Sequence, residues 1–202
     1  MRIYLIRHGQ TDWNIQGKIQ GSCNIPLNET GRRQARQLAE GMEARPVAKL
    51  FSSTLVRAME TAEAVSQRQG VGIIPLDSLI EIGFGKWEGM TNDEILEAYP
   101  KEYTHWCLNP GEAAPPGGES LREVTGRCKT AVKEILRTTG GREDAAVVSH
   151  GATIVHLISC MVPEAAEAGD IIVENASITT INYNPLTEDF VLLQLNDTSH
   201  LA

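Results

Sequence analysis

The stretch from Ile3 to Ile6 places the strongest constraint on the fold, because its four residues are all apolar and Arg7 and His8 follow at once. A strand without polar alternation is buried on both faces, which is typical of parallel sheets that helices cover on both sides. Further strand-like segments follow at residues 48–53, 144–149, 177–184 and 189–196. The chain therefore contains enough short strands for one central sheet.

Amphipathic segments separate most of these strands. Apolar residues at helical spacing predict helices at residues 28–44, 54–69, 119–137 and 152–162, and Asn28 is the capping residue of the first. Strands that alternate with helices predict an α/β fold. We expect a three-layer αβα sandwich with a mostly parallel central sheet.

The size and residue types of the chain limit its class. With 202 residues, of which 42% are hydrophobic, residues 1–202 can bury a core as a single domain. There is no signal-peptide pattern and no apolar run long enough to span a bilayer, so we expect a cytoplasmic protein without a membrane partner. The four cysteines are far apart and form no CxxC pair. We therefore expect reduced thiols, no metal site and no cofactor.

Residues 82–118 interrupt the alternation of strands and helices. Half of the ten aromatic residues lie within about two dozen positions here: Phe84, Trp87, Tyr99, Tyr103 and Trp106. Thr91 and Glu94 form a capping box for a short helix that ends before Pro100. We interpret the segment as an insertion within the single domain. It is either a lid over the functional site, which we favour, or a hydrophobic patch docked on the sheet.

Cationic or imidazole side chains follow three of the predicted strands. Arg7 and His8 end the first, Arg57 begins the helix after the second, and His150 follows the strand at 144–149. In open parallel sheets, ligands bind at the carboxyl ends of strands, where helix N-termini present free N–H groups to anions. Two guanidinium groups and two imidazoles at one sheet edge predict a site for a phosphoryl group.

The net charge of -8 excludes one class of phosphate-bearing partner. Binding a nucleic-acid backbone requires a concentrated cationic face, which this acidic chain lacks. An anionic substrate must instead be attracted by a local cluster of cations, because salt screens charges beyond about 8 Å. We therefore expect a small phosphorylated metabolite as the partner and no nucleic acid.

Five motifs in order along the chain carry a family resemblance. They are RHGQTDWN at 7–14, PLNETGRRQA at 26–35, SSTLVRAMETA at 52–62, EIGFGKWEG at 81–89 and SHGA at 149–152. Together they resemble the histidine phosphatase superfamily, also called phosphoglycerate mutase-like, over residues 2 to about 183. The resemblance implies the phosphoglycerate mutase-like fold and the metal-free chemistry of a phosphohistidine enzyme.

The resemblance implies a role for each matching residue. His8 would be the nucleophile that forms a phosphohistidine. Arg7, Arg57 and His150 would hold the phosphoryl oxygens and stabilise the charge that develops on them. Backbone N–H groups near Gly151 and Ala152 would add to this from the helix start.

Asn14, Gln20 and Gly151 would contact the substrate, although Asn14 also fits a turn residue. Glu81 matches the general acid that protonates the leaving group, and Phe84 and Trp87 nearby suggest a desolvated setting that would raise its pKa. Glu88 is the second choice for the acid.

Three functional hypotheses follow. The RHGQT motif and the short insertion favour a phosphomonoesterase, in pattern closest to the α-ribazole phosphatase and broad-specificity phosphatase branch. The first alternative is phosphoryl transfer of the cofactor-dependent phosphoglycerate mutase type. The second is a non-catalytic protein that binds a phosphorylated ligand. The acidic surface permits a symmetric homodimer. Of the other histidines, His156 is predicted to be a hydrogen-bonded core residue, and His105 and His200 to be surface residues.

Overall fold

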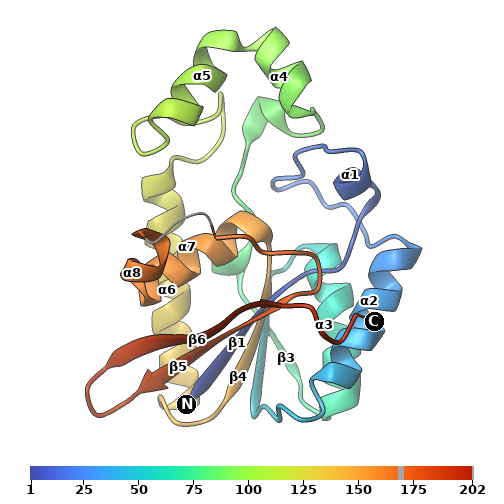
Figure 1. Cartoon of the computed structure of the whole chain (residues 1–202), viewed down its shortest axis with the longest axis vertical. Helices are drawn as coiled ribbons and strands as arrows, with labels where there is room; N and C mark the ends of the chain where they lie inside the picture. Colours follow the sequence, from blue (N-terminus) through green and yellow to red (C-terminus); the bar gives the residue numbers. More distant parts are fainter. Residues whose placement is uncertain (168–170, 202) are drawn as a thin grey trace.

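The computed structural model describes residues 1–167 and 171–201, and its centre is a six-stranded sheet in the order β3-β2-β4-β1-β5-β6 (Figure 1). The strands are β1 (Arg2–Arg7), β2 (Lys49–Ser52), β3 (Ile73–Pro75), β4 (Ala145–Ser149), β5 (Ile178–Asn184) and β6 (Asp189–Asp197). Neighbours from β3 to β1 are parallel, whereas β5 is antiparallel to both β1 and β6. The predicted mostly parallel sheet is thus confirmed.

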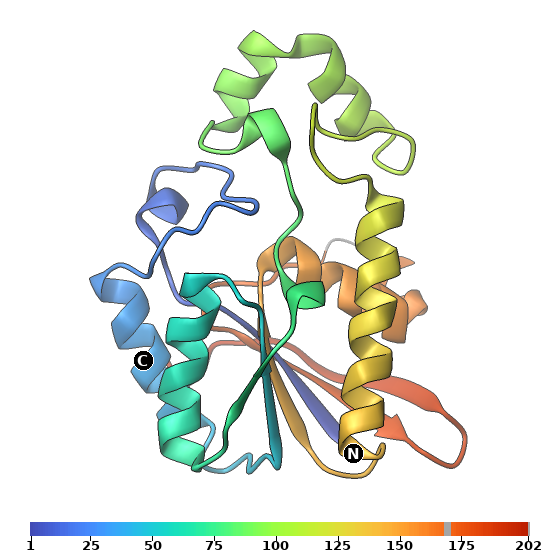
Figure 2. The same cartoon turned by 180° about the vertical axis from the view of Figure 1, so that it is seen from behind.

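Helices cover both faces of this sheet, as Figures 1 and 2 show. One face carries α2 (Glu29–Gly41) and α3 (Val56–Gln69), and the other carries α6 (Leu121–Thr139) and α7 (Gly151–Met161). Alternate residues of β1 enter the two cores: Ile3 and Leu5 pack with α6 and α7, while Tyr4 and Ile6 pack with α2 and α3. This double burial explains the apolar first strand and confirms the three-layer sandwich.

The remaining helices are short. They are α1 (Asp12–Ile15), α4 (Asn92–Ala98), α5 (Pro100–Leu108), α8 (Pro163–Glu167) and the 3-10 turns η1 (Asp77–Leu79) and η2 (Gly85–Trp87). None of the helices in the described part of the chain is long and apolar enough to cross a membrane.

Capping residues begin several helices, and two of them were predicted from the sequence. The Asn28 side chain accepts a hydrogen bond from the Gly31 amide at 2.8 Å, and the capping box of Thr91 and Glu94 starts α4. Helix α4 ends before Pro100 as predicted, but Pro100 then occupies the first turn of α5, a helix that the sequence interpretation missed. Proline is tolerated there because the first N–H groups of a helix have no partner within it.

The insertion at residues 82–118 lies beyond the carboxyl ends of the parallel strands, with α4 and α5 farthest from the sheet (Figure 1). Its aromatic side chains pack on each other: Trp87 lies edge-to-face with Tyr103 at 5.7 Å and with Trp106 at 6.1 Å between ring centroids. At the start of the segment, Ile82 is buried in the core between the sheet and helices α6 and α7, and Phe84 packs against this core. Both the lid and the docked patch therefore stay predictions.

Candidate active site

His8 follows β1 directly and is buried, with 2% of its surface exposed. Its ring Nδ1 lies 2.7 Å from the carbonyl oxygen of Gly9. A carbonyl only accepts hydrogen bonds, so Nδ1 carries the proton and Nε2 keeps a free lone pair. Burial, together with the positive charges of Arg57 and Arg7, holds the pKa of His8 well below its usual value. At neutral pH the ring is therefore an uncharged imidazole with a nucleophilic Nε2.

Two glycines allow the backbone after His8 to pack tightly against the start of α2. A Cβ atom on Gly9 would lie 2.5 Å from the carbonyl oxygen of Gly31, and one on Gly31 would lie 2.0 Å from that of Gln10. No side chain fits either position. The Gly9 amide also donates to the Thr61 hydroxyl of α3 at 3.1 Å. The loop that carries His8 is thereby held against both helices of this face.

Arg57 lies in the first turn of α3 and is fully buried. Its Nη1 donates to the Cys23 carbonyl at 2.7 Å and its Nη2 to the Gly21 carbonyl at 2.8 Å. Burial is the largest influence on its pKa and lowers it to about 10, so the group stays a cation at neutral pH. Arg7 is held in a similar way, because its Nη1 donates to the Val173 carbonyl at 2.7 Å.

His150 is the capping residue of α7 and is fully buried. Its ring centroid lies 5.2 Å from that of His8, and its Nε2 lies 2.7 Å from the Ser53 hydroxyl oxygen. Burial, followed by the charge of Arg57, holds the pKa of His150 well below its usual value. The four predicted residues at the strand ends thus stand as one half-buried cation, Arg7, one buried cation, Arg57, and two buried neutral imidazoles.

Three nitrogen atoms of this group are buried and have no hydrogen-bond partner among the described residues: Arg7 Nε, Arg57 Nε and His150 Nδ1. Buried polar groups are almost always hydrogen-bonded, and unpaired ones cost about 1–3 kcal/mol each. Unpaired nitrogens from three strand ends beside His8 are what an anion-binding site needs.

Glu81 lies after η1, where its carboxylate accepts hydrogen bonds from the start of α7. Its Oε1 accepts from the Thr153 amide and hydroxyl, both at 3.0 Å, and its Oε2 accepts from the Ala152 amide at 3.2 Å. Helix N-termini favour negative charge. Glu81 is half-buried, which agrees with the partly desolvated setting predicted for it, and hydrogen-bond donors contact its carboxylate. The Ala152 amide, which was predicted to face the phosphoryl group, binds Glu81 instead.

Glu88, the second choice for the acid, has a different position. Its carboxylate accepts hydrogen bonds from the amide and hydroxyl of Ser22, both at 2.9 Å, and from the Phe84 amide at 3.0 Å. These contacts join the insertion to the loop whose carbonyl groups hold Arg57. Gly21 in that loop has a φ of +50°, and a Cβ atom there would lie 2.1 Å from Glu88 Oε1.

The predicted substrate contacts differ in their surroundings. Asn14 forms a capping box with Thr11, so it is the local turn residue that the sequence allowed, and its side-chain oxygen is used. Gln20 is buried, and its Oε1 has no partner in the described part of the chain. Gly151 lies beneath Arg7, since a Cβ atom there would meet the guanidinium carbon at 3.5 Å.

Asn175 is a site residue that sequence reasoning missed. Its Nδ2 donates to the carbonyl of His8 at 3.0 Å and lies 3.4 Å from that of Gly9 and 3.3 Å from the side-chain oxygen of Asn14. It therefore positions the loop that carries His8. An asparagine three residues before a buried strand was the available signal, because asparagine side chains commonly bond nearby backbone groups.

The other three histidines lie outside this group. His105 is exposed, as predicted. His156 is half-buried without a hydrogen bond in the described residues, so the expected bonded core histidine is wrong. His200 was predicted to be a surface residue, yet it is partly buried and its Nε2 lies 2.9 Å from the Ala176 carbonyl.

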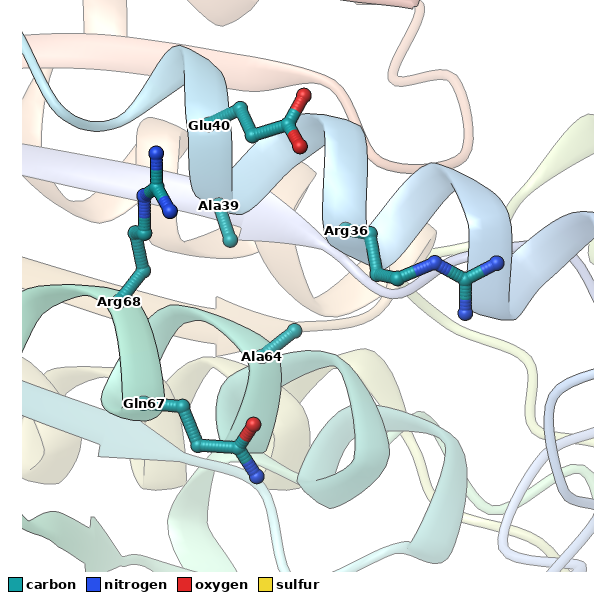
Figure 3. A pocket seen from close by; sticks show the side chains of 6 residues that line it. All are labelled: Arg36, Ala39, Glu40, Ala64, Gln67 and Arg68. Carbon is teal, nitrogen blue, oxygen red and sulfur yellow. The ribbon is translucent and has the colours of Figure 1, made fainter.

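A hollow of about 310 Å³ between α2 and α3 contains none of the predicted site residues (Figure 3). Arg36 and Glu40 line it from α2, and Gln67 and Arg68 line it from α3. Its charged side chains are exposed or half-exposed, unlike the buried Arg57 beside His8. It is therefore a surface groove between two helices and not part of the candidate active site.

Comparisons with known proteins agree with this geometry. The sequence profile of the histidine phosphatase superfamily (branch 1) matches residues 3–198. Phosphoserine phosphatase 1 of Hydrogenobacter thermophilus is 30% identical over 100% of this chain and 95% of its own, and a probable phosphoglycerate mutase GpmB of Cronobacter sakazakii is 32% identical over the same shares.

Among solved structures, a putative alpha-ribazole-5'-P phosphatase of Escherichia coli superimposes with a TM-score of 0.87 at 26% identity, covering 98% of this chain and 96% of that one. The predicted phosphoglycerate mutase-like fold is confirmed by this match. From its profile match and its buried pair of histidines, the chain belongs to the histidine phosphatase superfamily (branch 1).

Proposed function

We propose that this chain is a phosphatase that hydrolyses a small phosphomonoester through a phosphohistidine at His8. The observation that carries the proposal is the uncharged, buried His8 with a free Nε2 lone pair, surrounded by unpaired nitrogens of Arg7, Arg57 and His150. The relatives named as phosphatases support the same reaction class.

In the first step, the Nε2 lone pair of His8 forms a bond to phosphorus while the bond from phosphorus to the ester oxygen breaks. The guanidinium groups of Arg7 and Arg57 and the Nδ1 nitrogen of His150 stabilise the three remaining phosphoryl oxygens. The departing oxygen takes a proton from Glu81.

In the second step, water attacks phosphorus and the bond from nitrogen to phosphorus breaks, which returns the electron pair to His8. Glu81 accepts the proton of the water. Hydrogen bonds from the Ala152, Thr153 and Ile82 amides hold the Glu81 carboxyl group in place for this step.

The substrate side of the site includes Gln20, whose Oε1 has no partner among the described residues, the side-chain amide of Asn14 and the insertion at 82–118. We propose that this insertion is the lid that shapes the entrance, within a single domain of residues 1–202. Phosphoserine and α-ribazole phosphate are the first substrates to test, because relatives carry those names. The cytoplasmic location and the homodimer stay predictions.

The test is phosphate release from phosphoserine, α-ribazole phosphate and 3-phosphoglycerate, with and without EDTA. We expect EDTA-resistant release that the His8→Ala variant lacks. Arg36→Ala, a change to an exposed side chain of α2 outside the proposed site, is the control and should keep the wild-type rate. Activity in His8→Ala equal to the wild type would show that His8 is not the nucleophile.

The mutase alternative has one relative in its favour, the probable phosphoglycerate mutase GpmB. Transfer between two hydroxyl groups keeps the total organic phosphate constant, whereas hydrolysis lowers it. Measuring both products from 3-phosphoglycerate separates the two activities. A non-catalytic phosphate-binding protein would instead bind all three esters without forming either product.

A further inference from the structure

The buried contact between Ser53 and His150 determines which ring nitrogen of His150 carries the proton. Ser53 follows β2, is fully buried, and places its Oγ 2.7 Å from His150 Nε2. The same oxygen accepts a longer hydrogen bond from the Leu55 amide at 3.3 Å. No other partner of this hydroxyl exists among the described residues, so its own hydrogen has one acceptor within reach, the Nε2 atom.

Counting donors and acceptors distinguishes the two neutral forms of the ring. If Nε2 carried the hydrogen, Ser53 Oγ would accept from both Leu55 and His150, and its own hydrogen would be buried without an acceptor. If Nε2 is bare, Ser53 donates to it, and only the Nδ1 hydrogen of the ring is left without a partner among the described residues. The first form leaves two groups unpaired, the Ser53 hydrogen and the Nδ1 lone pair. Because each unsatisfied buried polar group costs about 1–3 kcal/mol, the second form is favoured.

The charged form of the ring is disfavoured by its surroundings. His150 is fully buried, and its pKa is held well below the usual value by that burial, by Arg57 and by His8. One proton therefore remains to be placed, and with Nε2 bare it lies on Nδ1. This Nδ1 is the buried nitrogen without a partner beside His8.

We propose that Ser53 is a positioning residue that holds His150 with its hydrogen on Nδ1, so that a neutral imidazole presents a donor to the phosphoryl oxygens. The reverse tautomer would present a lone pair to those oxygens and repel them. His8 and His150 then share one tautomer but use it in opposite ways: His8 turns its bare nitrogen to the phosphorus, and His150 turns its N–H to the oxygens.

The direct test is a long-range ¹H–¹⁵N correlation spectrum of the whole wild-type protein with ¹⁵N-labelled histidine, recorded at neutral pH. The ring signals of His150 are assigned by their loss in His150→Gln. We expect Nε2 to show the shift of a bare ring nitrogen and Nδ1 that of a protonated one. The reversed pattern, or two protonated nitrogens, overturns the inference, and this holds whatever the protein hydrolyses.

A variant pair tests the consequence for the reaction, which rests on the proposed function. Ser53→Ala removes the donor, and we expect kcat/KM to fall roughly 10-fold to 100-fold, the range seen when the partner that orients a working histidine is removed. The ring signals of His150 should move away from the pure Nδ1–H pattern at the same time.

Ser52→Ala is the matched control, because Ser52 is equally buried and its hydroxyl donates to the Ser53 backbone carbonyl at 2.9 Å, with no contact to His150 among the described residues. We expect its kcat/KM to stay near the wild-type value and its spectrum to keep the tautomer. Unchanged ring signals in Ser53→Ala, or equal losses in the two variants, contradict the proposal. A correct wild-type spectrum without any hydrolysis would instead reject the proposed function and leave the tautomer assignment standing.

Discussion

Replacing Glu81 with Gln separates its role as an acid from its role as a cap of α7. The Ile82 and Thr153 amides donate to Oε1, and the Thr153 hydroxyl shares its hydrogen between Oε1 at 3.0 Å and the Ile80 carbonyl at 2.7 Å. Among the described residues, the Ala152 amide alone contacts Oε2. The glutamine oxygen will therefore take the Oε1 position. Its NH₂ group then faces the Ala152 N–H, and because both groups are donors, no hydrogen bond forms between them.

The cost to stability follows from these contacts. One hydrogen bond to a charged group, worth about 1.5–3 kcal/mol, is lost, and the other three change from a charged to a neutral acceptor. We expect the free energy of unfolding to fall by about 2–4 kcal/mol in urea titrations. The variant should remain folded at 25 °C if the chain has the ordinary stability of a domain, about 5–15 kcal/mol.

The cost to catalysis depends on the leaving group. Phosphoserine leaves as a poor alkoxide that needs a proton, so we expect Glu81→Gln to lower kcat by about 10²–10⁴-fold. p-Nitrophenyl phosphate releases a stable phenolate that needs no acid, so Glu81→Gln should slow the first step far less with this substrate. Burst-phase measurement of p-nitrophenol isolates this step from the later attack of water.

The matched control is Glu88→Gln, which weakens the contacts to Ser22 and Phe84 but removes no proposed proton donor. It should lower the rates on both substrates by a similar factor. An equal loss on phosphoserine and p-nitrophenyl phosphate in Glu81→Gln would refute its role as the acid. A leaving-group dependence in Glu88→Gln instead would transfer that role to Glu88.

Three further predictions address stability and positioning. Because burial lowers the folded-state pKa of His8 and His150, the unfolded chain binds more protons than the folded one below pH about 6.5. The free energy of unfolding, measured in urea titrations, should therefore fall as the pH drops below that value, and it should fall less steeply in His8→Ala. Gly31→Ala should lower the melting temperature because its Cβ would meet the Gln10 carbonyl at 2.0 Å, and a wild-type melting temperature would contradict this packing. Gly126→Ala, with open space around it in α6, should instead raise the free energy of unfolding by about 0.4–1 kcal/mol. Asn175→Asp should lower kcat more than Asn175→Ala, because a carboxylate would face the His8 carbonyl; steady-state kinetics would contradict the positioning role if neither variant changed kcat.

Much of the fold and half of the site follow from local sequence rules. Strands apolar on both faces predict a covered parallel sheet, and the carboxyl ends of those strands then bring Arg7, His8, Arg57 and His150 together. The three residues of β3 and the four of α1 are too short for periodicity to reveal, and the sequence interpretation missed both.

The rest of the site depends on contacts between distant parts of the chain. The carboxylate of Glu81 caps a helix more than seventy positions away, and Asn175 reaches back over 167 positions to the His8 carbonyl. No pattern within one segment encodes such pairs. The family resemblance identified Glu81 by its position, but its polar surroundings required the assembled structure.

Hydrogen bonds join the insertion to the loop at residues 18–23. They determine which residues of the insertion can be substituted without moving Arg57. The Ile19 amide donates to the Met90 carbonyl at 2.9 Å, the Gly89 amide donates to that of Ile19 at 2.8 Å, and Glu88 binds Ser22 next to the carbonyls that hold Arg57. A substitution in residues 88–90 should therefore shift Arg57, which we propose binds the phosphoryl group, as well as the entrance to the site. Helices α4 and α5 lie outside this join, so a laboratory library that seeks new substrates should randomise residues 92–108 and leave 88–90 untouched.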